Sequence, residues 1–194
     1  MRLREIDRGD GVLNRLLIGI ISLVTGMRLP HAARVAFYHK AFFGVPMGAW
    51  TQAAMRGPSI WSVGERELMA AMVAKWNWCA FCVGAHGAIA SKEIQRPAVD
   101  AALADFCAAP ISDGLKAMLT FLEIMTLRPM ELTVENAKAV LDAGVSAEAL
   151  RDAIAVGALF SVVTRYADAL DFALPTANEF DRAASMLLKR GYAS

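Results

Sequence analysis

The chain has 194 residues, enough for one domain with a real hydrophobic core. Its 20 basic and 19 acidic side chains nearly cancel, and no basic block is present, which excludes an electrostatic surface for nucleic acid. Apolar residues make up 56% of the chain, against roughly 45–50% in an average globular protein. Either a membrane or a partner subunit must therefore cover the excess apolar surface.

The uncharged segments favour a partner subunit. Leu16–Met27 and Ala153–Thr164 are each only a dozen residues long, whereas a spanning helix needs about 18 or more apolar residues. The first fifteen residues mix acidic with basic side chains, unlike the basic start of a signal peptide. Three cysteines are too few for a disulfide scaffold, and because their number is odd, at least one would stay unpaired within the chain. We expect a cytoplasmic homo-oligomer, a trimer or a hexamer, with no membrane span.

Helical periodicity continues through nearly the whole chain, without the alternation or the Asn-Gly and Asp-Gly turns that mark strands. Prolines, glycines and capping residues divide it into about nine or ten helices of a single all-α domain, 1–194. We place N-terminal helices and an oligomer contact in 1–60, and the core in 62–172. The predicted helices are 12–26, 31–43, 47–56, 62–76, 79–93, 97–106, 113–127, 134–142, 147 to about 172, and 176–190.

The chemically distinctive segment holds Cys79, Cys82 and His86, spaced i, i+3 and i+7. At about 100° per residue these side chains fall within roughly 60° of one another on a helix. Cys79 is placed at the start of the helix, where free N–H groups favour a thiolate. Two cysteines in this arrangement can form a reversible disulfide, and His86 can exchange a proton with Cys82.

Two other interpretations compete with the redox pair. Buried cysteines often behave as small apolar residues. A zinc site is the other possibility, because the two thiols and His86 supply three ligands and a structural site needs a fourth. Candidates for that fourth ligand, none with paired ligand spacing, are His31, His39, Cys107 and Glu67.

A resemblance to a known family rests on Glu67, followed twelve residues later by C-x-x-C-x-x-x-H at 79–86. This pattern resembles the signature of the carboxymuconolactone decarboxylase/alkylhydroperoxidase AhpD superfamily. The segments 128–150 and 160–170 are also similar to that family, and the resemblance covers about 62–172. Phe81 stands before the second cysteine, where some members have a second relay histidine.

The resemblance implies an AhpD-like helical bundle, obligate oligomers and a peroxidase-type oxidoreductase with Glu67, Cys79, Cys82 and His86 as catalytic residues. A hydroperoxide would be the substrate. Because no nucleotide loop, flavin motif or haem ligand set is evident, we predict no cofactor and an external dithiol reductant. We expect Glu67 and His86 to draw the proton from Cys82, whose sulfur attacks the peroxide before Cys79 closes the disulfide. The position of Cys79 at the helix start, where the free N–H groups and the helix dipole favour a thiolate, indicates instead that Cys79 is the attacking sulfur.

Two other functions stay open on the sequence alone. The first is a carboxymuconolactone decarboxylase-like lyase that uses Glu67 and His86 for acid–base chemistry, with the thiols incidental. The second is a redox sensor or an oligomeric scaffold without enzymatic activity. The decarboxylase branch of the superfamily lacks the C-x-x-C pair, so the pair favours redox chemistry.

Overall fold

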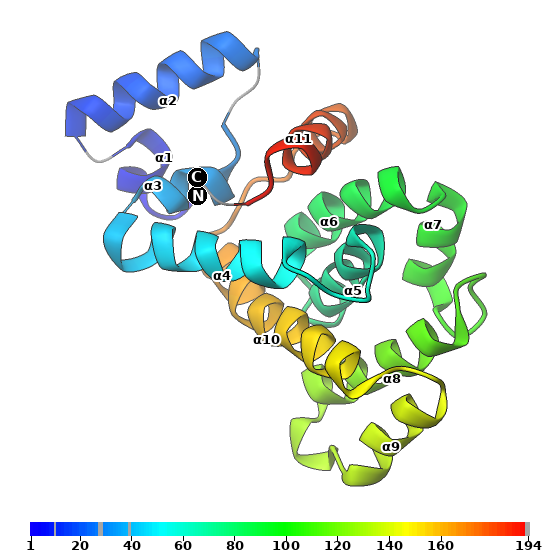
Figure 1. Cartoon of the computed structure of the whole chain (residues 1–194). Helices are drawn as coiled ribbons and strands as arrows, with labels where there is room; N and C mark the ends of the chain where they lie inside the picture. Colours follow the sequence, from blue (N-terminus) through cyan, green and yellow to red (C-terminus); the bar gives the residue numbers. More distant parts are fainter. Residues whose placement is uncertain (10, 27–28, 39, 193–194) are drawn as a thin grey trace.

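The computed structural model describes residues 1–9, 11–26, 29–38 and 40–192, and these residues contain helices but no strand (Figure 1). A π-helical turn, Lys40–Gly44, and a 3-10 turn, Pro129–Glu131, join some of the helices. The α-helices are α1 Arg4–Arg8, α2 Gly11–Thr25, α3 His31–Phe37, α4 Val45–Arg56, α5 Val63–Trp76, α6 Ala80–Glu93, α7 Arg96–Asp105, α8 Asp113–Leu127, α9 Val134–Asp142, α10 Ala147–Ala169 and α11 Ala177–Arg190. The predicted single all-α domain is confirmed.

Helix α5 is the central element of the fold. Its start is fixed by the predicted capping box, in which the Ser62 hydroxyl accepts from the Glu65 amide and the Glu65 carboxylate accepts from the Ser62 amide. Eleven of its 14 residues are buried, because α4, α6, α8 and α10 pack around it (Figure 1). A polar side chain on α5 is therefore held in a rigid, water-poor environment.

Helices α5 and α6 form a tight antiparallel pair joined by the short turn 77–79. At Gly64 a Cβ atom would lie only 2.8 Å from the Cβ of Glu93, so the start of α5 needs glycine to approach the end of α6. The long helix α10 crosses the pair and continues through Gly157. There a Cβ would lie 2.5 Å from Met125 Cε and 2.8 Å from Leu122 Cδ2, so this glycine permits close packing on α8.

Most predicted helix bounds agree with the structure, and two of them, 113–127 and 134–142, are reproduced without change. The predicted helix 31–43 is wrong. Helix α3 ends at Phe37 because Tyr38 has an extended backbone, with φ −80° and ψ 132°. Pro46 does not separate two helices either. It lies in the first turn of α4, where proline is tolerated because its missing N–H has no helical partner.

Helix α2 stands apart from the packed body of the molecule, at the blue end of the chain (Figure 1). Its apolar side chains are largely exposed, including Val12, Leu13, Leu16, Leu17, Ile20, Leu23 and Val24. None of the described helices is both long and apolar enough to cross a membrane. Large exposed apolar faces usually mark an interface, and α2 presents such a face.

Candidate functional site

Glu67 lies on α5 with its side chain fully buried, at 0% exposure. Its Oε2 atom is 2.6 Å from Nδ1 of His86 on α6. Its Oε1 atom accepts from Nη1 of Arg56, at the end of α4, and from the hydroxyl of Tyr192, both at 2.8 Å. We call Arg56, Glu67, His86 and Tyr192 the relay cluster. These four residues come from four separate parts of the chain.

The relay cluster keeps Glu67 ionised. Burial alone raises the pKa of a carboxyl group, and here it is the largest single influence. The His86 side chain acts in the opposite direction through its charge and its hydrogen bond, and Arg56 and Tyr192 add to this effect. The net result is a Glu67 pKa below the ordinary value of 4.5. The carboxylate is therefore an acceptor at neutral pH rather than a proton donor.

Arg56 and Tyr192 also contact each other. The guanidinium carbon of Arg56 lies 4.8 Å from the centroid of the Tyr192 ring, in a cation–π arrangement. Burial, followed by the negative charge of Glu67, raises the Tyr192 pKa well above its ordinary value. The phenol therefore stays protonated and donates to Glu67 throughout the neutral range.

His86 is held by an aromatic contact with Phe160 as well as by its hydrogen bond to Glu67. The ring of Phe160 on α10 meets it edge-to-face, with the centroids 4.4 Å apart. Because Glu67 is ionised, the proton of a neutral His86 is assigned to Nδ1, which donates to Glu67. The other ring nitrogen, Nε2, then carries a lone pair and can accept a proton. A carboxylate that orients a histidine in this way is a common arrangement for a general base.

The two thiols form a second, separate cluster at the start of α6. Both are free in this structure and almost fully buried, at 0% exposure for Cys79 and 1% for Cys82. They pack in a small apolar group with Ala74, Phe81 and Ala167. Cys79 is the N-cap residue of α6, as the predicted helix start required.

The environments of the two sulfurs differ. A hydrogen bond from the Cys82 thiol is the largest influence on Cys79 and lowers its pKa below 9.0. The Cys82 amide adds to this effect, while burial opposes it. The same thiol–thiol hydrogen bond, together with burial, raises the pKa of Cys82. The negative charge of Asp168 on α10 disfavours a thiolate at either position. The lowered pKa of Cys79 agrees with its position at the helix start, and the expectation that Cys82 attacks the peroxide stays untested.

The relay cluster and the thiols are neighbours without direct contact. Among the described residues, no hydrogen bond joins His86 to either sulfur. His86 follows Cys82 by four residues on α6, so their Cβ atoms are about 6 Å apart on one helix face. A bridging water or a small rotation of either side chain can close such a gap.

Comparison with solved structures shows the same architecture in several proteins. An uncharacterized peroxidase-related protein from Silicibacter sp. TM1040 superposes with a TM-score of 0.76 at 22% identity, covering 93% of each chain. The alkylhydroperoxidase AhpD core of an uncharacterized peroxidase-related protein from Ralstonia eutropha JMP134 gives a TM-score of 0.73 at 24% identity, covering 86% of each chain. The apo debrominase Bmp8 gives 0.70 at 19% identity, covering 86% of this chain and 89% of its own.

The chain has an AhpD-like fold. Identities this low show the shared architecture and not a shared activity, and one of the three proteins is a debrominase. No family model and no curated protein sequence matches the chain. The assignment of chemistry to this AhpD-like chain must therefore come from its own side chains.

The four predicted site residues divide into the pair Glu67 and His86 and the pair Cys79 and Cys82. Sequence reasoning missed Arg56 and Tyr192. Both lie outside the segment that carries the resemblance, and no local spacing links them to Glu67. Only the AhpD-like packing of α4, α5 and α6 and the return of the chain after α11 bring them to it.

Two further residues near the thiol end of the molecule have defined partners. The guanidinium of Arg165 donates to the carbonyl of Ser161, one turn earlier on α10. His31 is 4% exposed, accepts from the amide of Ala173 at 2.9 Å, and lies 3.3 Å from Asp7.

The zinc interpretation lacks a fourth ligand in the described part of the chain. No three His, Cys, Asp or Glu side chains within these residues gather closely enough to hold a metal ion. Cys107 is exposed and His31 is engaged as just described. His39, the other candidate ligand, lies outside the described residues.

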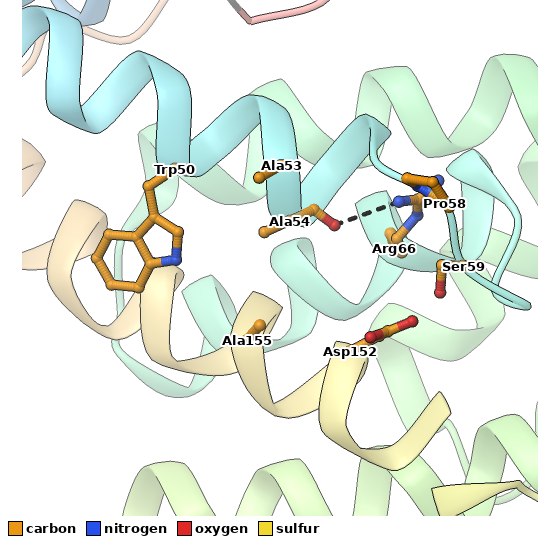
Figure 2. Close-up of a pocket in the computed structure, with 8 residues that line it drawn as sticks. All are labelled: Trp50, Ala53, Ala54, Pro58, Ser59, Arg66, Asp152 and Ala155. Atoms are coloured by element: carbon orange, nitrogen blue, oxygen red, sulfur yellow. Dashed lines mark hydrogen bonds between the residues drawn. The ribbon is translucent and has the colours of Figure 1, made fainter. Parts of the chain in front are cut away.

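A hollow of about 200 Å³ between α4, α5 and α10 is a separate feature (Figure 2). Arg66 lies at one end of it and Trp50 at the other. The Arg66 Nη1 atom donates to the carbonyl oxygens of Ala54 at 3.3 Å and Gly57 at 2.8 Å. Arg66 therefore satisfies carbonyl groups at the end of α4. Neither a thiol nor a sequence neighbour of Cys79 lines this hollow, so it does not belong to the candidate site.

Proposed function

We propose that this protein is a thiol-based peroxidase-type oxidoreductase that reduces hydroperoxides through a Cys79–Cys82 dithiol–disulfide cycle. The observation that carries the proposal is the pair of buried free thiols at the start of α6, where Cys79 is the N-cap residue and Cys82 lies in the first turn, and where the Cys82 thiol lowers the pKa of Cys79. A thiolate is the nucleophilic form of cysteine, and a second thiol within bonding reach is what a reversible disulfide requires.

The first step is attack of the Cys79 thiolate on the peroxide. The sulfur forms a bond to one oxygen of ROOH as the O–O bond breaks, which gives a sulfenic acid on Cys79 and the alkoxide RO⁻. The alkoxide takes a proton and leaves as the alcohol ROH. The sulfur is oxidised by two electrons and the peroxide is reduced by two.

The second step needs a base, because the pKa of Cys82 is raised. We assign this role to His86, which Glu67 orients. His86 Nε2 takes the Cys82 proton, the Cys82 sulfur attacks the Cys79 sulfur, and the sulfenic hydroxyl leaves as water with a proton. In this proposal the relay cluster removes the proton from Cys82, whereas the helix start stabilises the thiolate of Cys79.

An external dithiol then restores the pair. One of its thiolates attacks the Cys79–Cys82 disulfide to give a mixed disulfide, and its second sulfur releases the protein thiol, so the reductant leaves as a disulfide. We expect Cys79, at the start of α6, to be the protein sulfur that forms the mixed disulfide.

The direct test follows both peroxide and thiols in a Cys107→Ser background, which leaves only the pair. Addition of tert-butyl hydroperoxide to the reduced protein is expected to protect both remaining cysteines from alkylation, and mass spectrometry should show them linked. With excess dithiothreitol the protein should consume peroxide catalytically. Two thiols that stay alkylatable after peroxide treatment would overturn the proposal. A linked pair without turnover would favour a redox sensor.

We further propose a homo-oligomer, a trimer or a hexamer, with α2 at the contact. The support is the exposed apolar face of α2, because obligate interfaces bury on the order of 2,000 Å² or more of such surface. Light scattering at micromolar concentration is expected to give a multiple of the 20.9 kDa chain mass.

A substitution on α2 tests the position of this contact. Ile20→Asp places a charge at a half-exposed position and should dissociate the assembly. The matched control is Val134→Asp, which changes an equally apolar but more exposed residue on α9 and should leave the assembly intact. A stable, active monomer, or an intact oligomer carrying Ile20→Asp, would contradict the proposed contact.

A further inference from the structure

A hollow of about 230 Å³ lies at the start of α6, where Cys79 is buried beneath the surface and does not itself line it. Trp78 and Ala80, the two neighbours of Cys79 in the sequence, both line it. Phe81 and Ala167, which pack in the same apolar group as the two sulfurs, also line it. The hollow therefore adjoins the segment and the apolar group that hold Cys79.

Two strained backbone positions meet at this hollow. Among the described residues, Trp78 with φ 61° and Asp171 with φ 57° are the non-glycine residues with positive φ, and both line the hollow. Each follows the end of a helix, α5 or α10, at a position where glycine is usual. A left-handed conformation is unfavourable for a non-glycine residue, because its Cβ atom comes too close to the following carbonyl oxygen. Strain of this kind gathers at functional sites.

Backbone hydrogen bonds hold Trp78 in place despite this strain. The amide of Trp78 donates to the carbonyl of Lys75 at 3.0 Å, and the amide of Cys79 donates to that of Ala74 at 2.9 Å. The side chain of Trp78 is nevertheless 91% exposed, so the core gains almost nothing from it. A large aromatic residue that is both strained and exposed needs a role outside core packing.

The rest of the lining of this hollow is apolar, apart from the carboxylates of Asp168 and Asp171. Phe81 and Phe172 meet edge-to-face at 5.1 Å, and Leu174 is 62% exposed. Asp168 is the charged group that acts on both thiols. Asp171, the other acid, lies 3.8 Å from the amino group of Met1.

Positive charge near the hollow does not cancel Asp168. The Arg2 guanidinium donates to the backbone carbonyls of Asp168 and Ala169, at 3.0 and 2.8 Å, and not to the Asp168 carboxylate. Among the described residues, Asp168 has no ion pair. We therefore expect the Asp168 carboxylate to disfavour an anion that approaches Cys79 more than an uncharged molecule.

We propose that this hollow binds the molecule that reacts at Cys79, and that it selects an uncharged molecule with an aromatic or branched-alkyl body over an anionic one. The inference rests on the proposed function only in treating Cys79 as the reactive sulfur. The volume corresponds to about seven or eight waters at ~30 Å³ each, so it can hold a ring or a branched alkyl group. An apolar hydroperoxide and an uncharged dithiol share this chemistry.

The charge preference is tested with matched methanethiosulfonate reagents on the reduced full-length Cys107→Ser protein. In each reaction the Cys79 thiolate forms a mixed disulfide and a sulfinate leaves, so no peroxide turnover is needed. The rate with the neutral methyl reagent, relative to the anionic sulfonatoethyl reagent, is normalised to the same ratio for a free small thiol. We expect about a tenfold preference for the neutral reagent.

Asp168→Asn should reduce this preference severalfold. The control Asp142→Asn, which removes an exposed acid at the end of α9, should leave it unchanged. A normalised ratio near one in the starting protein, or an equal ratio in Asp168→Asn, would overturn the charge selection.

The apolar preference is tested with benzyl against methyl methanethiosulfonate. Trp78→Gly relieves the strained φ and removes the aromatic wall, so it should lower the benzyl preference severalfold while the melting temperature stays the same or rises. Asp171→Gly relieves the other strained φ without removing aromatic surface, and it should keep the benzyl preference. A preference that survives in Trp78→Gly, or a lowered melting temperature with both rates equally reduced, would show that Trp78 is structural and would overturn the proposal.

The same variant distinguishes the two sources of the bound molecule. If Trp78→Gly slows oxidation by cumene hydroperoxide more than oxidation by hydrogen peroxide, the hollow binds the peroxide. If it instead slows disulfide reduction by dithiothreitol, the hollow binds the reductant. Either result supports the site. Failure of peroxide turnover in all variants, with the reagent preferences intact, would count against the proposed function and not against this site.

Discussion

Cys79→Ser is expected to lower the rate of peroxide consumption by at least about a thousandfold, because it removes the thiolate that attacks the O–O bond. Cys82→Ser should also stop turnover, but by a different route. The Cys79 sulfur can still react once, and without its partner thiol the sulfenic acid should persist. Trapping with dimedone followed by mass spectrometry should place the adduct on Cys79.

Two comparisons make this experiment decisive. Cys107→Ser changes an exposed thiol away from the site and should keep full activity. In Cys79→Ser the remaining Cys82 no longer lies beside a thiolate, whose negative charge raises its pKa, so some reactivity at Cys82 is compatible with the assignment. Sulfenic acid that forms on Cys82 at the wild-type rate would instead restore the sequence-based expectation that Cys82 attacks the peroxide.

Glu67→Gln is expected to lower the free energy of unfolding by about 3–5 kcal/mol, the usual cost of breaking a buried ion pair by removing one partner. The substitution leaves the Arg56 guanidinium buried without a counter-charge, and it replaces an acceptor of three hydrogen bonds with an amide. Urea denaturation followed by circular dichroism measures the change. Resolution of the sulfenic acid should slow as well, because His86 loses the carboxylate that orients it.

The control for Glu67→Gln is Glu148→Gln, which changes an exposed carboxylate in the first turn of α10 and should leave the urea midpoint almost unchanged. A double change, Arg56→Leu with Glu67→Leu, removes both charges and should recover much of the lost stability. A midpoint for Glu67→Gln equal to that of Glu148→Gln would contradict the ion-pair account.

The contribution of Glu67 to the free energy of unfolding depends on pH, and the direction of this dependence follows from its pKa. The folded-state pKa of Glu67 is lowered from 4.5, so its contribution to stability is fully present above the unfolded-state pKa. The contribution is lost as the pH falls through the lower folded-state value. Acid should therefore destabilise the wild type more steeply than Glu67→Gln in this range.

The local features of this fold were predictable because they depend on nearby residues. The Ser62–Glu65 capping box and the helix start at Cys79 both follow from short-range spacing. The break after Phe37 was not predictable in this way, since no proline or glycine marks Tyr38, and its extended backbone reflects how α3 meets the rest of the chain. Propensity alone does not contain that information.

The candidate site shows the same division. The spacing of Cys79, Cys82 and His86 on one helix could be derived from periodicity, and the resemblance added Glu67. Arg56 and Tyr192 could not be found, because an ion pair between distant segments leaves no periodic signal. The lowered pKa of Cys79 and the raised pKa of Cys82 also depend on burial and on Asp168 of α10, which the spacing of the motif does not contain.

The attachment of Tyr192 to Glu67 has a consequence for how the molecule folds. The hydrogen bond between these side chains spans 125 positions along the chain, and the one from the Tyr192 amide to Gln52 spans 140. Contacts between residues so far apart in the sequence form late in folding. Closing the long loop between them costs chain entropy before the contact contributes any stabilisation. The α5–α6 hairpin, by contrast, is local and carries both thiols. During refolding the cysteine pair should therefore be assembled before its relay is complete, and oxidation in that interval would reach a dithiol that still lacks its oriented base.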